Sequence, residues 1–171
     1  FHTERLIIRP TIEDDADFIK ELRNSPKWIK YIGGKGSHSI DATKEYIRKT
    51  MIPQLERLGY SNYTVIRSDD EVKVGICGLY DREGLDGLDL GFALLPRYEG
   101  NGYAYESSSK LVQVAFNEFE IESLRAITAP ANLASQKLLE KLGFKLIERK
   151  TLPNENRESI VYKIINSNTA S

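Results

Sequence analysis

The sequence predicts an α/β or α+β protein whose mixed sheet carries helices on both faces. Apolar residues alternate with period two in several short segments, which indicates strands, and recur at helical spacing in others, which indicates amphipathic helices. A turn with two glycines also joins one apolar strand directly to a helix, at residues 94–104. The elements follow in the order strand, two helices, three strands, helix, strand, helix, two strands, which is typical of such a layered architecture.

A strand and a helix come first. Residues 6–9 are apolar enough for a strand, which Pro10 ends. Thr11 with Asp14, three residues later, resembles the capping box that begins a helix. We therefore expect a helix that ends near Asn24.

A glycine-rich segment and a longer helix follow. Residues 27–37 contain too much glycine for regular structure, so we expect a mobile loop there. Helical spacing of apolar residues then predicts a second helix from Ser39 to Gly59. We expect it to kink at Pro53, because proline cannot donate the helical hydrogen bond.

Three strands are expected next. Residues 60–67 and 72–80 are joined by a short polar turn, which predicts a hairpin. Residues 88–95 then alternate strictly between two faces. One face carries Leu88, Leu90, Phe92 and Leu94, and the other carries Asp89, Gly91, Ala93 and Leu95.

The remaining elements form a strand, helix, strand unit and a final strand pair. An apolar stripe predicts a helix from about residue 103 to 119, followed by a strand at 123–129. A helix at 132–142 should end at Gly143, and residues 144–150 and 160–165 should pair. We expect one domain over residues 1–165 and a disordered tail at 166–171.

Composition restricts the class of protein. The chain has 171 residues, 24 basic and 25 acidic, so nothing favours a general nucleic-acid or anionic-membrane surface. A single cysteine, Cys77, cannot form an internal disulfide, and no apolar run reaches the roughly 20 residues of a membrane helix. We expect a cytoplasmic protein, although the chain begins at Phe1 and residues could precede it. His2 and His38 lack ligand spacing with Cys77, so we expect no metal site.

The glycine turn is suited to hold an anion. Gly100 and Gly102 let the backbone turn tightly, and the first N–H groups of the following helix lack helical partners and can point at a phosphate. Arg97 adds a positive charge beside them. A plain strand-to-helix connection is the alternative interpretation.

Two segments together resemble the GNAT family of acetyl-CoA-dependent N-acetyltransferases. Residues 97–102 match the family's Arg-X-X-Gly-X-Gly loop, and residues 132–144 resemble its Asn-X-X-Ser helix with a Leu-Gly-Phe ending. Residues 3–9 and 75–79 are similar to the branch that contains the ribosomal-protein N-terminal alanine and serine acetyltransferases. The resemblance extends from Thr3 to about Ile165.

The resemblance implies the GNAT fold, a mostly antiparallel sheet of about seven strands flanked by about four helices. It implies acetyl-CoA as co-substrate and direct attack of a primary amine on the thioester in a ternary complex. The α-amino group of a protein or peptide is the first expectation for the acceptor, and a small amine or amino-acid-like metabolite is the alternative. A monomer or a homodimer is compatible with the sequence.

The resemblance also assigns cofactor residues. In this family the fourth and fifth strands splay apart, so the backbone of the fourth strand is free to pair with the pantetheine amides. These backbone groups belong to Phe92, Ala93, Leu94 and Leu95. The residues expected to line the phosphates are Arg97, Gly100, Asn101, Gly102, Tyr103 and Ala104, with Tyr98 and Glu99 facing solvent.

Asn132 and Ser135 have two interpretations each. Asn132 is a good helix N-cap, and in similar enzymes it also bonds the pantetheine arm. Ser135 is a candidate proton donor to the leaving thiolate, although a serine at this place often bonds nearby backbone.

Asp89 is the candidate general base, because it stands where similar enzymes often carry a glutamate before a Gly-aromatic pair. The shorter aspartate would need a bridging water. A solvated charge on an outer strand face is the other interpretation, and Glu155 and Glu158 are alternative bases. Trp28 and Tyr31 are candidates for the acceptor site.

Two other functions compete with the enzyme. A non-catalytic CoA-binding sensor would bind the cofactor without turnover. A dinucleotide-binding domain is disfavoured because the glycine turn comes late in the chain and lacks a third glycine at Tyr105.

Overall fold

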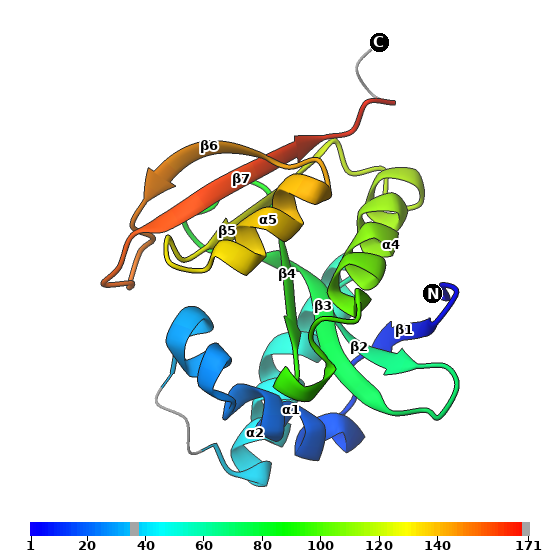
Figure 1. Cartoon of the computed structure of the whole chain (residues 1–171). Helices are drawn as coiled ribbons and strands as arrows, with labels where there is room; N and C mark the ends of the chain where they lie inside the picture. The colour runs from blue at the N-terminus through cyan, green and yellow to red at the C-terminus, as the bar shows by residue number, and fades with distance from the viewer. Residues whose placement is uncertain (35–37, 169–171) are drawn as a thin grey trace.

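A seven-stranded mixed sheet forms the centre of the protein (Figure 1), and the computed structural model describes residues 1–34 and 38–168. The strand order is β1-β2-β3-β4-β5-β7-β6, and all neighbours are antiparallel except β4 and β5. The strands are β1 (Leu6–Pro10), β2 (Asn62–Arg67), β3 (Lys73–Asp81), β4 (Leu88–Leu94), β5 (Ser123–Thr128), β6 (Lys145–Lys150) and β7 (Ser159–Ile165). The expected mostly antiparallel sheet is confirmed.

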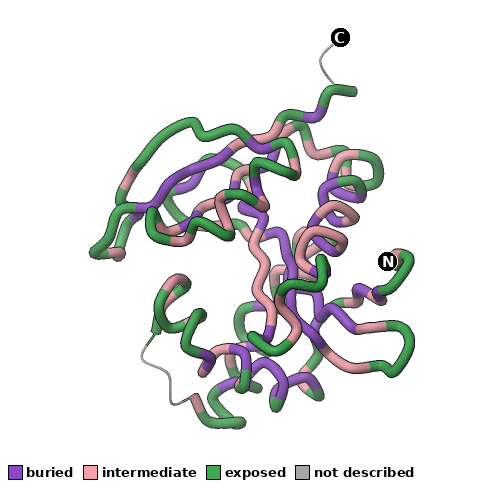
Figure 2. Tube along the Cα trace, in the orientation of Figure 1, coloured by how far each residue is buried: buried purple, intermediate pink, exposed green. Residues whose placement is uncertain are grey.

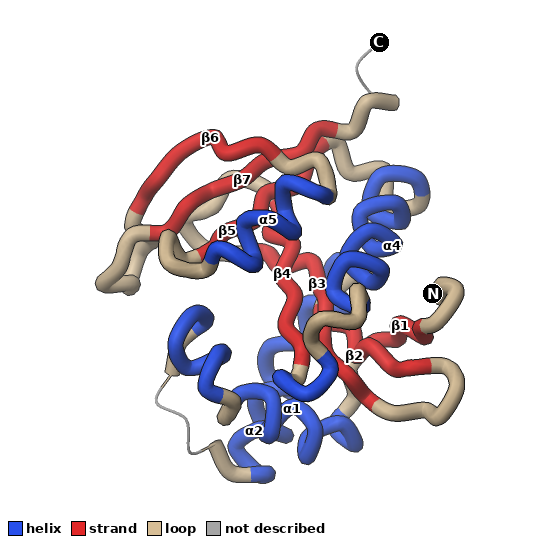
Figure 3. Tube along the Cα trace, in the orientation of Figure 1, coloured by secondary structure: helices blue, strands red, loops and turns tan. Residues whose placement is uncertain are grey.

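Helices cover both faces of this sheet (Figure 3). They are α1 (Ala16–Arg23), α2 (Ile40–Tyr46), α3 (Ile52–Leu58), α4 (Tyr103–Asn117) and α5 (Leu133–Lys141). A wide π-helical turn, Ile47–Met51, joins α2 to α3, so these two continue as the single helix expected between Ser39 and Gly59. This π-helical turn lies just before Pro53. Proline has no N–H to donate to the preceding turn of a helix, and the wider turn removes the need for that hydrogen bond.

The start of the first helix differs from the expectation by one residue. The Asp15 carboxylate, not that of Asp14, accepts the N-terminal backbone hydrogen bond, from Ile12 N at 3.0 Å. The Thr11 hydroxyl lies instead 2.9 Å from the Thr64 hydroxyl in β2. The expected capping box is therefore wrong, because Thr11 bonds across the sheet rather than along the chain.

The segment expected to be a mobile loop contains a helical turn. Trp28–Ile32 form one π-helical turn, closed by a hydrogen bond from Gly33 N to Trp28 O at 2.9 Å. The expectation of a loop is wrong there, because the glycines lie after the turn and do not interrupt it. Residues 35–37 of that segment lie outside the described residues.

Two apolar clusters lie on opposite faces of the sheet, and β2 and β3 are buried along most of their length, whereas residues 91–94 of β4 are half-buried (Figure 2). The larger cluster packs α4 and α5 on one face and includes Leu90 of β4. The smaller packs α1 and the Ile47–Met51 turn on the other face and includes Leu95. The alternation expected along this strand is therefore confirmed.

β4 and β5 separate soon after they begin. Their ladder contains only the pairs Leu88↔Leu124 and Asp89↔Arg125, and beyond these the two strands diverge (Figure 1). Leu95 N donates to Val74 O at 2.9 Å on the β3 side, so by alternation the backbone groups of Phe92 and Leu94 point to the open edge. The splay that the resemblance implies is present.

The C-terminal end of the described chain is anchored. Asn166, at the start of the expected tail, is buried, and its side-chain amide donates to Phe116 O and Ile121 O at 3.3 and 3.4 Å. Ordered structure therefore extends past β7 to this residue, whereas residues 169–171 are not described. In the part of the chain that the structure describes, no helix has the length and apolar character needed to span a bilayer.

Candidate active site

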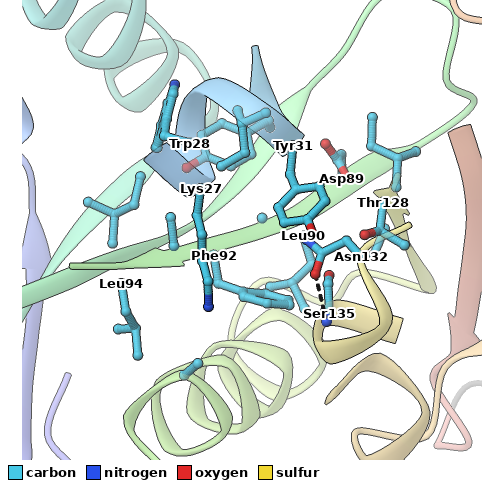
Figure 4. Close-up of a pocket in the computed structure, with 18 of the residues that line it drawn as sticks. Lys27, Trp28, Tyr31, Asp89, Leu90, Phe92, Leu94, Thr128, Asn132 and Ser135 are labelled. Carbon is cyan, nitrogen blue, oxygen red and sulfur yellow. Dashed lines mark hydrogen bonds between the residues drawn. The ribbon is translucent and has the colours of Figure 1, made fainter. Parts of the chain in front are cut away.

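A pocket of about 750 Å³ occupies the gap where β4 and β5 diverge (Figure 4). Its lining comes from all the layers of the fold: β3, β4 and β5, the starts of α4 and α5, and the Trp28–Ile32 turn. Of the residues predicted for the site, those that line it are Trp28, Tyr31, Asp89, Phe92, Ala93, Leu94, Gly100, Gly102, Ala104, Asn132 and Ser135. One cavity thus connects the glycine turn to Asp89.

The glycine turn presents free backbone donors to this cavity. The first bond within α4 runs from Glu106 N to Gly102 O at 3.0 Å, so the N–H groups of Tyr103, Ala104 and Tyr105 have no helical partner. Gly102 is the N-cap with φ of 81°, a conformation that favours glycine. These donors, at the positive end of the helix dipole, suit a diphosphate.

Two residues of the predicted phosphate loop have other partners. The Arg97 guanidinium forms an ion pair with Glu21 of α1 and does not line the cavity. The Asn101 amide donates to Tyr98 O and Glu99 O, both at 3.1 Å, so it holds the turn together. Tyr98 is half-buried against both apolar clusters, so the expectation that it faces solvent is wrong.

Two more predicted cofactor residues have side chains in the core. Leu95 and Tyr103 are buried, one in each apolar cluster. The backbone of Leu95 is also used within the protein, because its N–H donates to Val74 O and its carbonyl accepts from Tyr98 N, both at 2.9 Å, so the expected cofactor contact at Leu95 is wrong. The N–H of Tyr103 has no helical partner and is available to a ligand.

Asn132 and Ser135 lie together at the start of α5, across the cavity from Trp28 and Tyr31 (Figure 4). Asn132 Oδ1 accepts from Ser135 N at 3.2 Å, which confirms the N-cap. The Ser135 hydroxyl itself forms no hydrogen bond within the described residues. The alternative interpretation, a bond from this hydroxyl to nearby backbone, is therefore wrong. The hydroxyl remains available to a group in the cavity.

Asp89 is a buried carboxylate at the point where the two strands part. It is 1% exposed, so the interpretation as a solvated surface charge is wrong. Its Oδ2 accepts from Arg82 Nε at 2.8 Å, and its Oδ1 has no hydrogen-bond partner among the described residues. Burial raises the pKa of Asp89 to about 6, although the Arg82 charge and hydrogen bond oppose the rise. The carboxylate is therefore ionised but still basic near neutral pH.

The two alternative carboxylates lie in different places. Glu155 lines the cavity. Glu158 is exposed, pairs with Arg149 at 3.1 Å, and does not line it. Of the two, only Glu155 faces the cavity.

The Trp28–Ile32 turn is tied to the loop between β6 and β7. Arg157 in that loop donates to Lys30 O at 2.9 Å and to Tyr31 O at 3.1 Å. This bridge holds Trp28 and Tyr31 over one side of the cavity. Their predicted place near an acceptor is thus compatible with the structure.

Several lining residues were missed by the sequence analysis. They include Lys27, Tyr46, Asn62, Tyr80, Arg82 and Thr128. Tyr80 faces Asp89 across β3 and β4, so a register for that hairpin would have found it. Cys77 is buried, and burial raises the pKa of its thiol to about 12, which does not favour a nucleophilic thiolate.

Comparison with known proteins gives one consistent result. Residues 5–145 match the family model described as the acetyltransferase (GNAT) domain. The uncharacterized N-acetyltransferase p20 of Bacillus licheniformis is 28% identical over 147 residues, which cover 84% of this chain and 81% of that protein.

Solved structures agree with this match. A GNAT-family acetyltransferase from Bacillus anthracis has a TM-score of 0.80 and 25% identity, covering 96% of this chain and 97% of that one. Ribosomal-protein-S5-alanine acetyltransferase from Vibrio fischeri shares the fold, with a TM-score of 0.79 and 19% identity over 98% of this chain and 96% of that one. Since the family model covers most of its length, the chain belongs to the GNAT family of acetyl-CoA-dependent N-acetyltransferases and is an acyltransferase.

Proposed function

We propose that this enzyme acetylates the N-terminal α-amino group of a protein or peptide, by direct attack of the amine on acetyl-CoA in a ternary complex. The observation that carries the proposal is Asp89. Its carboxylate is buried, basic and partly unpartnered, and it lies in the same cavity as the free N–H groups of α4. An amine placed between the two would meet both the base and the thioester.

The residues fit acetyl-CoA. The unpaired N–H groups at the start of α4 suit its diphosphate, and the open edge of β4 at Phe92 and Leu94 suits the amides of its pantetheine arm. Bound acetyl-CoA supplies an activated acetyl group and a thiolate leaving group. The protein then has to orient the thioester carbonyl carbon, bind the amine next to it and transfer two protons.

The basicity of Asp89 favours an α-amino acceptor over a lysine side chain. An ammonium group must lose its proton before it can attack. Transfer to a carboxylate with a pKa of about 6 costs about 2.7 kcal/mol from an α-amino group of pKa about 8, but about 6 kcal/mol from lysine at about 10.4. The smaller deprotonation cost is a minor part of the activation free energy of an enzyme reaction. The larger cost takes up much of that activation free energy.

Acetyl transfer forms one bond, breaks one bond and moves two protons. The amine nitrogen forms a bond to the acetyl carbon, and the bond from that carbon to sulfur breaks. Asp89 takes the amine proton through a water, because an aspartate side chain is short. The nitrogen loses its second proton as the amide forms, and the Ser135 hydroxyl, which lines the same cavity, relays a proton to the departing thiolate and regains this one.

The fold itself is compatible with a protein acceptor. The Vibrio fischeri neighbour, which shares the fold, is named as an acetyltransferase of alanine in a ribosomal protein, which supports a protein acceptor. In our chain Trp28 and Tyr31 line the same cavity as Asp89. They provide apolar surface for the first side chain of a peptide.

The experiment is an acceptor comparison that measures thiol released from acetyl-CoA. One peptide carries a free α-amino group and no lysine, and its partner has the same sequence with a blocked N-terminus and one added lysine. Small amines complete the panel. We expect turnover with the first peptide and acetylation of its N-terminus by mass spectrometry. Turnover confined to lysine or to small amines would overturn the acceptor assignment.

A further inference from the structure

An ion pair links the glycine turn to the residue that precedes the Trp28–Ile32 turn. The ammonium of Lys27 pairs with the carboxylate of Glu99, and both residues line the cavity. Glu99 was expected to face solvent, but it is half-buried and belongs to this lining. Figure 4 shows the Lys27 amine directed away from Trp28 and into the cavity. A positive charge is thereby held at the glycine turn.

Three basic side chains line the cavity within the described residues, and two of them have other partners. Arg82 pairs with Asp89 at 2.8 Å, and Arg157 donates to two carbonyl groups of the Trp28–Ile32 turn. The third is Lys27. Its ammonium has three donors, and the Glu99 carboxylate is its one hydrogen-bond partner among the described residues. Two donors of this ammonium are therefore free for a ligand.

The phosphate end of the cavity lacks a full positive charge unless Lys27 supplies it. The sequence pattern assigned this charge to Arg97, but Arg97 pairs with Glu21 and does not line the cavity. The start of α4 contributes N–H donors and the partial charge of a helix dipole. The Glu99 carboxylate would repel a diphosphate if Lys27 did not balance its charge. An exposed ion pair of this kind is weak, so the ammonium can turn toward a phosphate at little cost.

We propose that Lys27 binds the diphosphate of the cofactor and takes the role that the sequence pattern gives to Arg97. One donor of the ammonium stays on Glu99 and another binds a phosphate oxygen. The diphosphate is then held by two sources of positive charge, the free N–H groups of α4 and the Lys27 ammonium. This inference rests on the acetyl-CoA part of the proposed function and not on the choice of acceptor, so cofactor binding alone tests it.

The main test is Lys27→Met, with the Kd for CoA measured by titration calorimetry in the absence of an amine. The substitution keeps the length of an exposed side chain and removes its charge. Kd should rise about tenfold at low salt, because a hydrogen bond between two charged groups is lost. The rise should shrink at high salt, where the charges are screened. Lys27→Arg, which retains the charge, should bind CoA within about threefold of the wild-type value.

A second variant separates direct contact from support of the glycine turn. Glu99→Gln breaks the ion pair and keeps the charge of Lys27. If Lys27 contacts the diphosphate, loss of a nearby negative charge should lower the Kd for CoA about twofold. If Lys27 serves only to hold Glu99 in place, Glu99→Gln should weaken CoA binding as much as Lys27→Met does. That result would overturn the proposal.

Dephospho-CoA identifies the phosphate that is bound. This analogue lacks the 3′-phosphate and keeps the diphosphate, so Lys27→Met should weaken its binding by the same factor as that of CoA. A loss of affinity that is seen with CoA and absent with dephospho-CoA would assign Lys27 to the 3′-phosphate. The role at the diphosphate would then be overturned.

Lys30→Met is the matched control, because it removes the same charge from the same segment. The Lys30 ammonium lies 5.0 Å from the centre of the Tyr31 ring, and the residue does not line the cavity. Its Kd for CoA should stay within about twofold of the wild-type value. If Lys30→Met weakens CoA binding as much as Lys27→Met does, the effect is general electrostatics and the proposal is overturned.

The remaining outcomes separate this proposal from the proposed function. If the wild-type protein binds no CoA, the acetyl-CoA part of the proposed function fails and the role of Lys27 fails with it. If the wild-type protein binds CoA and Lys27→Met leaves Kd within about twofold, only the role of Lys27 is overturned. If no amine releases thiol while CoA binding is intact and sensitive to Lys27→Met, the acetyl transfer fails and the role of Lys27 in cofactor binding stands.

Discussion

Replacing Asp89 with asparagine tests the catalytic base directly. The substitution keeps the shape of the side chain and removes its ability to take a proton. A positioned general base contributes about 100-fold or more to the rate, so kcat should fall by at least about that factor. Because the pKa of Asp89 is about 6, kcat of the wild-type enzyme should rise about tenfold from pH 5 to a plateau above about pH 7. In Asp89→Asn this rise should be absent.

The same pKa predicts a change in stability with a definite sign. Burial raises the pKa of Asp89 from 3.8 to about 6, so between these values the folded state binds more protons than the unfolded state. The free energy of unfolding therefore falls as pH rises, by about 3 kcal/mol in total from this group, of which about 2 kcal/mol falls between about pH 4.5 and 7.5. The variant lacks this fall. Asp89→Asn also removes the ion-pair partner of Arg82. This loss changes the free energy of unfolding of the variant by the same amount at both pH values.

Both effects are measurable with one control. Thiol release at saturating acetyl-CoA and amine gives kcat from about pH 5 to 8, and urea unfolding at about pH 4.5 and 7.5 gives the stability difference. Glu158→Gln is the control, because Glu158 is an exposed carboxylate that pairs with Arg149 outside the cavity. If Asp89→Asn keeps the rise near pH 6 and loses less than about threefold in kcat, the base is another group, with Glu155 next to test.

Three further predictions concern the cofactor end and the core. Glu21→Gln frees Arg97, so KM for acetyl-CoA should fall about twofold at low salt and the gain should vanish at high salt; no change would show that Arg97 does not face the phosphates. Gly102→Ala places a Cβ 3.3 Å from Arg5 at a φ of 81°, so we expect a loss of about 1 kcal/mol in urea unfolding and a higher KM for acetyl-CoA. Native Cys77 should not react with a thiol reagent, whereas the unfolded chain should react at one equivalent; fast native reaction would contradict its burial.

The parts of the fold that the sequence predicted are those encoded by local pattern. Strict alternation placed Asp89 and Leu90 on opposite faces of β4, and the structure confirms this because each face meets a different apolar cluster. Asn132 is an N-cap because its own side chain bonds the next turn. Such features depend on residues close in the chain, so one sequence is enough to find them.

The features that the sequence missed depend on distant partners. Thr11 suggested a local cap, but in the structure its hydroxyl bonds Thr64, which lies 53 residues away. Arg157 holds the Trp28–Ile32 turn across more than 120 residues, through carbonyl groups that carry no sequence signal. Tyr80 needed the register of β3 and β4 before it could be placed beside Asp89. Period and spacing contain no information on these pairings.

The divergence of β4 and β5 places both halves of the site side by side. An open strand edge in the middle of a sheet leaves backbone groups unpaired, which is unfavourable unless a ligand or water satisfies them. Asp89 stands in the last residue pair before the strands part, where it is buried and one carboxylate oxygen has no hydrogen-bond partner among the described residues. The free edge that suits the pantetheine arm therefore begins beside the buried carboxylate that suits proton transfer. A substitution that closed the gap should weaken cofactor binding, because the backbone groups of β4 would pair with β5 instead.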